Sequence, residues 1–211
     1  MEQVTRPPVL VDEPTYAYME KWAADHGSDM KCIAEVGCWF GGGTQRIWEG
    51  LKRSEFAARG GEYHCFDRWV ASRRGARKAA TGGVFYSGPH LDVAEGEDIL
   101  PYFTRFTDGL PLTIHQEDDC AGGPPWHGPP PDWFILDACK QTRAKVLRRF
   151  YGDFVPKGTI ITLLDLWWLS CREQRKWAKW ATREGYLECI SDSPQWIFFR
   201  VTSPCPVEIR S

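Results

Sequence analysis

Short apolar runs alternate with helical patterns along most of this chain, and this alternation limits the fold more than any other feature of the sequence. Five such runs read as buried strands: KCIAEVG (31–37), EYHCFD (62–67), PLTIHQED (111–118), DWFILDA (132–138) and GTIITLLDLWW (158–168). Two more, YLECI and QWIFFRV, flank a short polar link near the C-terminus and can pair as an antiparallel hairpin. Apolar strands alternating with helices predict a parallel sheet covered on both faces. We therefore expect an α/β fold: a doubly wound, mostly parallel sheet of seven strands that ends in an antiparallel hairpin.

The predicted helices lie between these strands. Residues 13–26 place Tyr16, Met19, Trp22 and Ala23 on one helical face, and Gly27 is a favourable stop. Further helices are expected at 44–57, 99–106, 143–154 and 170–185, the last opened by a capping box of Ser170 with Glu173.

No linker or internal repeat divides the chain, so one domain over residues 1–211 is expected, with a helical segment at 1–28. Residues 70–98 carry charge and glycine with little periodicity. Such long segments are commonly lids or binding loops, and we expect a lid here.

Composition excludes several function classes. The formal net charge is −2, which gives no electrostatic reason to expect a nucleic-acid partner. No segment has the apolar length of a membrane span, and the N-terminus lacks the build of a signal peptide. The eight cysteines form no C-x-x-C and no zinc-like cluster. These features predict reduced cysteines and a cytoplasmic protein.

The stretch IAEVGCWFGGGT (33–44) places four glycines in the turn between the first predicted strand and the helix that follows it. A phosphate-binding P-loop needs G-x-x-x-x-G-K-[ST]; here the spacing from Gly37 to Thr44 fits, but Gly43 stands in the lysine position. The dinucleotide fingerprint G-x-G-x-x-G is also absent. The loop therefore suits a ligand that approaches the backbone closely without a phosphate.

Two acids complete a third interpretation of this loop. Glu35 lies two residues before Gly37, and Asp67 ends the second strand, where a carboxylate can accept both ribose hydroxyls of a nucleoside. S-adenosylmethionine is such a ligand: Glu35 would face its ammonium end and Asp67 its ribose. A tight packing turn with a surface aspartate is the alternative. The cofactor-binding residues expected in and near the loop are Glu35, Gly37, Trp39, Gly41, Gly42, Thr44 and Asp67.

The segment AEVGCWFGGGT resembles the first motif of class I S-adenosylmethionine-dependent methyltransferases. The order of FDRW, IHQEDD, WFILDACKQT and PKGTIITLLDLW further resembles the macrocin O-methyltransferase family, over roughly residues 30–168. That resemblance implies a Rossmann-like fold, O-methylation of a small hydroxylated acceptor such as a sugar or glycoside, and a divalent metal held by carboxylates at two strand ends. The sequence departs from the family where Cys139 and Leu164 replace acids.

Three residues are candidates for the chemistry. Methyl transfer to a hydroxyl needs a base or a metal to remove the proton. Asp137 and Asp165 end the fourth and fifth predicted strands, where ligands of such sheets bind. Asp137 and Asp165 could hold Mg²⁺ together with substrate oxygens. In a metal-free site Asp137 could itself act as the base. Alternatively, both aspartates could cap helices. His90, in the expected lid, is the alternative base.

Other residues have two open interpretations. Glu117 and Asp118 end the third strand and could accept the adenine amino group or be solvated at the sheet edge. Trp69 could cover the nucleoside or pack in the core. Trp167 and Trp168 could stack on a sugar or form a homodimer interface.

Two further functions compete with the methyltransferase. One is a degenerate fold that binds a nucleoside or a partner protein without turnover. The other is an NAD- or ATP-using enzyme, which the loop disfavours.

Overall fold

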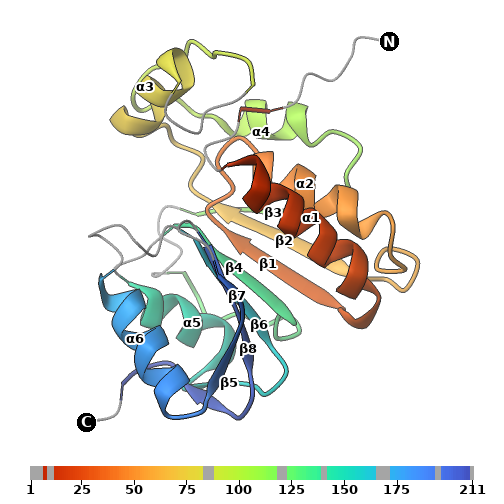
Figure 1. Cartoon of the computed structure of the whole chain (residues 1–211). Coiled ribbons are helices and arrows are strands. Elements are labelled where there is room, and N and C mark those ends of the chain that lie inside the picture. Colours follow the sequence, from red (N-terminus) through yellow and green to blue (C-terminus); the bar gives the residue numbers. More distant parts are fainter. Residues whose placement is uncertain are drawn as a thin grey trace.

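A computed structural model describes residues 7–8, 12–82, 88–117, 123–138, 142–164, 172–192 and 196–209 of the chain. Its centre is a seven-stranded sheet in the order β3-β2-β1-β4-β6-β8-β7 (Figure 1). The strands are β1 (Cys32–Val36), β2 (Glu62–Asp67), β3 (Leu112–Gln116), β4 (Trp133–Leu136), β6 (Ile160–Leu164), β7 (Leu187–Asp192) and β8 (Trp196–Val201). A separate ribbon pairs β5 (Phe154–Val155) with β9 (Cys205–Pro206).

The topology is the predicted one. Strands β3, β2, β1, β4 and β6 run parallel, whereas β8 pairs antiparallel with both β6 and β7. The strand order reverses between β1 and β4, because the chain first builds outward through β2 and β3 and then returns to the other side of β1. In open α/β sheets ligands bind outside the carboxyl ends of the strands at such a reversal. The fold thus points to the ends of β1 and β4.

Two helical layers cover the sheet, as the fully apolar strands require. One face packs against α1 (Glu13–His26) and α2 (Gly42–Leu51), through a core that includes Trp22, Trp48 and Trp133. The other face packs against α5 (Arg143–Tyr151) and α6 (Arg172–Arg183), around Phe134, Phe150 and Trp177. Side chains alternate between the two clusters along β1, where Ile33 belongs to the first and Ala34 to the second.

Several element boundaries differ from the sequence-based expectation. Helix α1 has the predicted bounds and is followed by a short 3-10 turn, η1 (Gly27–Asp29), while α2 ends six residues before the expected residue 57. Helix α4 (Leu100–Phe106) and the β7–β8 hairpin confirm the predictions. The expected capping residue Ser170 lies outside the described residues.

The segment 70–98 contains a helix that the sequence analysis missed. Helix α3 (Arg73–Thr81) is capped by Ser72, whose side chain accepts a hydrogen bond from the backbone N–H of Gly75. Its apolar face consists only of Ala76 and Ala79, so charge and glycine masked the helical period.

In the described part of the chain no helix is long and apolar enough to cross a membrane.

Candidate functional site

A small cavity lies at the reversal of strand order. Its volume is about 50 Å³, and its lining includes Glu35 from β1, Gly37 and Trp39 from the following loop, Asp137 after β4, and Tyr16 from α1. We call it the Glu35 cavity. No lysine, arginine or histidine occurs among the described residues that line it. Because typical ligand pockets hold 300–1,000 Å³, the cavity as it stands can take only a small part of a nucleoside-sized ligand.

Pro8 also lines the Glu35 cavity, and Gly88 packs closely against Pro8. A Cβ built on Gly88 would lie 2.9 Å from the Pro8 Cα atom. Pro8 therefore connects the lining of the cavity to Gly88.

Glu35 is almost completely buried beside the cavity. Its Oε2 accepts hydrogen bonds from Thr44 Oγ1 and from Tyr63 Oη, both at 2.7 Å. The pKa of the Glu35 carboxyl is raised to about 7, chiefly by burial and also by the nearby carboxylates of Asp137 and Asp67. These two hydrogen bonds stabilise the ionised form, but no described cation does so. The environment therefore favours a cationic ligand group at Glu35.

Asp67 organises the loop between β1 and α2. Its Oδ2 accepts a hydrogen bond from the backbone N–H of Trp39 at 2.9 Å, and its Oδ1 accepts one from the backbone N–H of Trp69 at 3.0 Å. Both tryptophans have positive φ, 50° for Trp39 and 47° for Trp69, a conformation that bulky residues rarely adopt. Asp67 thus holds two strained positions and keeps one accepting site free on each oxygen for a ligand.

The glycines of the loop are required by close contacts. Gly37 has φ +99°, and a Cβ added there would lie 2.7 Å from the Cβ of Ala138. Gly41 has φ +88°, and an added Cβ would lie 2.9 Å from a methyl group of Thr107. Gly37 therefore allows the loop to cross the end of β4, and Gly41 allows the start of α2 to pack against α4. Gly42 begins α2 and lines the cavity.

Asp137 lies at the predicted strand end. Its backbone N–H donates to the carbonyl of Val36 at 2.9 Å, which fixes the residue beside the end of β1. Its side chain lines the Glu35 cavity. Asp165, its expected partner for a metal, lies outside the described residues.

A metal site needs a cluster of ligand side chains among the described residues. The one group of three metal-binding side chains within them is Glu35, Cys38 and Cys65, whose ligand atoms lie within 4.8 Å of one another. Mg²⁺ takes oxygen ligands and not thiols. Burial also raises the pKa of both thiols, which keeps them protonated. This group does not fit Mg²⁺, and it does not include Asp137.

The structure does not bring every candidate to the cavity. His90 is exposed on the segment 88–98 and does not line it. The side chain of Trp69 is fully buried against Phe103, with ring centroids 4.8 Å apart, so of its two open interpretations the structure shows core packing. The hydroxyl of Thr44 is also buried and serves to hold Glu35.

Glu117 forms an ion pair with a residue of α5. Its carboxylate forms a bidentate ion pair with Arg149 of α5, which uses one accepting position on each oxygen. Asp118, Trp167 and Trp168 lie outside the described residues.

Sequence analysis missed Tyr63 and Tyr16. Tyr63 lies two residues before Cys65, the neighbour of Glu35 in the β1–β2 register, so both side chains point to the same face of the sheet. The alternation of side chains along a strand could therefore have predicted that Tyr63 lies on the same face as Glu35. Tyr16 was assigned only to the core face of its helix, and nothing in the local pattern indicated that this face reaches a cavity.

The sequence matches no protein-family model and no curated protein. Solved structures match over most of the chain. The O-methyltransferase NovP superposes with a TM-score of 0.60 at 14% identity, over 89% of this chain and 79% of that one. A Podospora anserina methyltransferase, PaMTH1, with bound S-adenosylhomocysteine gives 0.56 at 13%, over 92% and 80%. A Bacillus cereus O-methyltransferase, also with bound S-adenosylhomocysteine, gives 0.52 at 14%, over 92% and 83%. These likenesses confirm the predicted resemblance in fold: this chain has the Rossmann-like fold of class I S-adenosylmethionine-dependent methyltransferases.

Proposed function

We propose that this protein transfers a methyl group from S-adenosyl-L-methionine to an oxygen of a small hydroxylated acceptor, such as a sugar or glycoside. One observation carries the proposal. Glu35, Asp67 and Asp137 interact electrostatically at the reversal of strand order, and no described residue that lines the Glu35 cavity is cationic. Such an arrangement favours a ligand that brings positive charge, and S-adenosylmethionine carries both an ammonium and a sulfonium.

The same charge distribution argues against the two competing cofactors. NAD and ATP place phosphates at the first glycine loop, where a helix N-terminus or a lysine neutralises them. Here a phosphate would meet the carboxylate of Glu35, and Gly43 stands where a P-loop has its lysine.

The chain offers a role for each acid. Glu35, held by Thr44 and Tyr63, would accept the ammonium end of the cofactor. Asp67 would accept the ribose hydroxyls with the oxygen lone pairs that the backbone leaves free. The cofactor supplies the reactive methyl group, and the protein mainly aligns it with the acceptor oxygen.

Asp137 is the described carboxylate best placed to remove the acceptor proton. It follows β4 and lines the cavity with Glu35. The sugar or glycoside acceptor rests on the motif resemblance, and an oxygen acceptor is supported by two matched structures that are O-methyltransferases. Because Cys139 and Leu164 stand where the resembling family has paired acids, we propose a metal-free base. A cytoplasmic location and a homodimer remain proposals from the sequence.

Calorimetry tests the cofactor directly. Titration with S-adenosylmethionine and S-adenosylhomocysteine should show micromolar binding of both, whereas ATP and NAD at the same concentrations should give no heat of binding. If neither of the first two binds, the proposed function is wrong. Only S-adenosylmethionine has the sulfonium charge. The difference in affinity between S-adenosylmethionine and S-adenosylhomocysteine therefore measures the contribution of that charge to binding.

A second candidate function is a nucleoside-binding module without turnover. It is favoured by Cys139 and Leu164, which stand where the resembling family has acids. Incubation of the protein with S-adenosylmethionine and a panel of glycosides distinguishes the two, because only an enzyme produces S-adenosylhomocysteine in proportion to a methylated acceptor. Binding without that product across phenolic and sugar acceptors would favour the module.

A further inference from the structure

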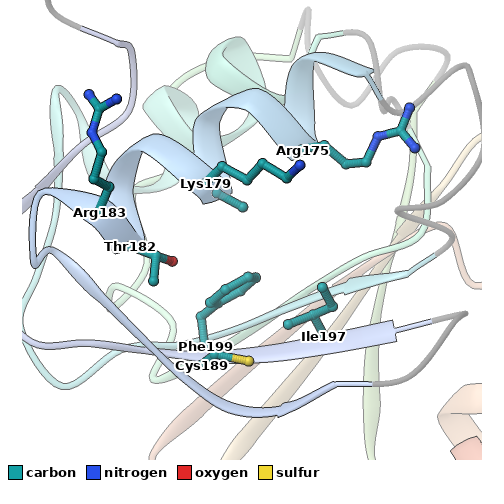
Figure 2. Close-up of a pocket in the computed structure, with 8 residues that line it drawn as sticks. Arg175, Lys179, Thr182, Arg183, Cys189, Ile197 and Phe199 are labelled. Atoms are coloured by element: carbon teal, nitrogen blue, oxygen red, sulfur yellow. The ribbon is translucent and has the colours of Figure 1, made fainter.

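A second hollow lies on the other face of the sheet, between α6 and the β7–β8 hairpin. Its volume is about 380 Å³, within the range of small-molecule pockets. Figure 2 shows Thr182 pointing down from α6, and Phe199, Ile197 and Cys189 on the strands below it. We call it the α6 groove. It is separate from the Glu35 cavity, because Phe199 belongs to the α5–α6 core and Tyr16 belongs to the α1–α2 core.

The groove exists because α6 presents small side chains to the hairpin. Ala178 and Thr182 are one turn apart and face the strands, where larger residues would fill the space. Below them, Phe199 and Ile197 supply an apolar floor. A ligand in the groove would therefore replace water on an apolar surface, which favours binding of a hydrocarbon group.

Basic side chains of α6 line the helical side of the groove. Arg175, Lys179 and Arg183 are spaced four residues apart on α6, and such spacing places them on one face. In Figure 2 the Lys179 side chain runs along α6 between Arg183 and Arg175, whose guanidinium groups point away from Phe199 and Ile197. Lys179 forms no ion pair with any described residue, whereas Arg183 pairs with Glu184. Lys179 is thus the cation best able to receive an anion.

We propose that the α6 groove binds an amphipathic carboxylate of the fatty-acid type. The hydrocarbon chain lies between Thr182 and Phe199, and the carboxylate pairs with the ammonium of Lys179. An apolar hollow alone would accept many molecules, but the ammonium of Lys179 selects for an anionic head group. The proposal does not depend on the methyltransferase function.

Cys189 supplies a local reporter, because it is exposed and lines the groove. Iodoacetamide alkylates a cysteine as the thiolate sulfur displaces iodide, and peptide mass spectrometry resolves Cys189 from the other cysteines. Decanoate, below its micelle-forming concentration, should slow alkylation of Cys189 in a saturable way. Decanol, which has a similar chain and no charge, should protect far more weakly.

Two variants and a matched control locate the binding. Lys179→Gln should raise the decanoate concentration for half-protection about tenfold, the scale of one charge-assisted hydrogen bond. Lys176→Gln, on the same helix but outside the groove, removes an equal charge and should leave that concentration unchanged. Thr182→Trp should fill the groove and abolish protection. Each variant is compared with its own rate without decanoate, since a charge change alters thiol reactivity.

Several outcomes would overturn the proposal. Equal protection by decanol would show that the cations play no part, and unchanged protection in Thr182→Trp would place decanoate elsewhere. Absence of protection in the folded wild-type protein would exclude this ligand class. If sedimentation shows a dimer that Thr182→Trp dissociates, the groove is covered by a second copy of the chain and not by a fatty acid.

Discussion

The carboxylate of Asp67 joins the end of β2 to the backbone N–H of Trp39, in the loop after β1, at 2.9 Å. The same carboxylate also holds Trp69. Left-handed backbone costs about 1–2 kcal/mol for a residue with a side chain, and Asp67 offsets that cost at both positions. An acid that sequence analysis assigned to a ligand therefore also shapes the loop that would bind it.

Replacement of Asp67 by alanine should weaken S-adenosylmethionine binding by about 1–3 kcal/mol and lower the free energy of unfolding by a similar amount, because two partly buried N–H groups lose a charged acceptor. Calorimetry and urea unfolding measure the two effects. In a Trp39→Gly background the stability cost should be smaller, since glycine adopts positive φ without strain. Unchanged affinity in a folded Asp67→Ala protein would mean that β2 does not end at the ribose.

Gly37→Ala should be more harmful than Gly60→Ala. Both glycines have positive φ, +99° and +73°, but a Cβ on Gly60 meets nothing within 4 Å. Gly60→Ala therefore reports the backbone cost alone, about 1–2 kcal/mol. Gly37→Ala adds a collision with Ala138 and should also abolish cofactor binding. Equal unfolding free energies for the two variants would contradict the close approach of the loop to β4.

The unliganded protein should lose stability as the pH rises from about 4.5 to 7. Glu35 has an ordinary pKa of 4.5 and a folded-state pKa of about 7, so the folded state holds the proton more tightly than the unfolded state. The contribution of Glu35 is fully present below pH 4.5 and is lost through pH 7, a change on the order of 3 kcal/mol. Urea unfolding across this range should show a smaller decline in Glu35→Gln, which cannot ionise. An identical pH profile for the variant would exclude Glu35 as the source.

Cofactor binding should have the opposite pH dependence. A cationic ligand selects the ionised form of Glu35, so affinity should increase as the pH rises from 5 to 8, and binding should release protons near neutral pH. Calorimetry in buffers of different ionisation enthalpy measures that release. Glu35→Gln should bind more weakly and release fewer protons. Proton uptake by the wild-type protein would be inconsistent with an ammonium group at Glu35.

Asp137→Asn should lower kcat by about 10²–10⁴-fold, the usual contribution of a general base, with little change in cofactor affinity. EDTA should leave the wild-type rate unchanged, and the rate should fall at acid pH as the carboxylate is protonated. His90→Ala is the matched control and should remain active. Loss of activity with EDTA would show a metal requirement, whereas an inactive His90→Ala with an active Asp137→Asn would transfer the role of base to the segment 88–98.

The sequence alone was enough to predict the fold. Alternating apolar runs specified the parallel strands, because strands covered on both faces must be apolar throughout. The bounds of α1 and the antiparallel hairpin followed from local periodicity. Glu35 is predicted from its place just before the glycine loop, and Asp137 because parallel strands carry the residues at their carboxyl ends to one edge of the sheet.

Only the tertiary structure decided what each side chain touches. Tyr63 holds Glu35 from 28 residues away, and Glu117 pairs with Arg149 from 32 residues away. These contacts depend on strand register and helix packing, which no local pattern encodes. Trp69 shows the same limit: its place after β2 suggested a ligand contact, but a positive φ held by Asp67 turns its ring into the core. Periodicity reports which face of an element is apolar, and three-dimensional packing decides which partner lies there.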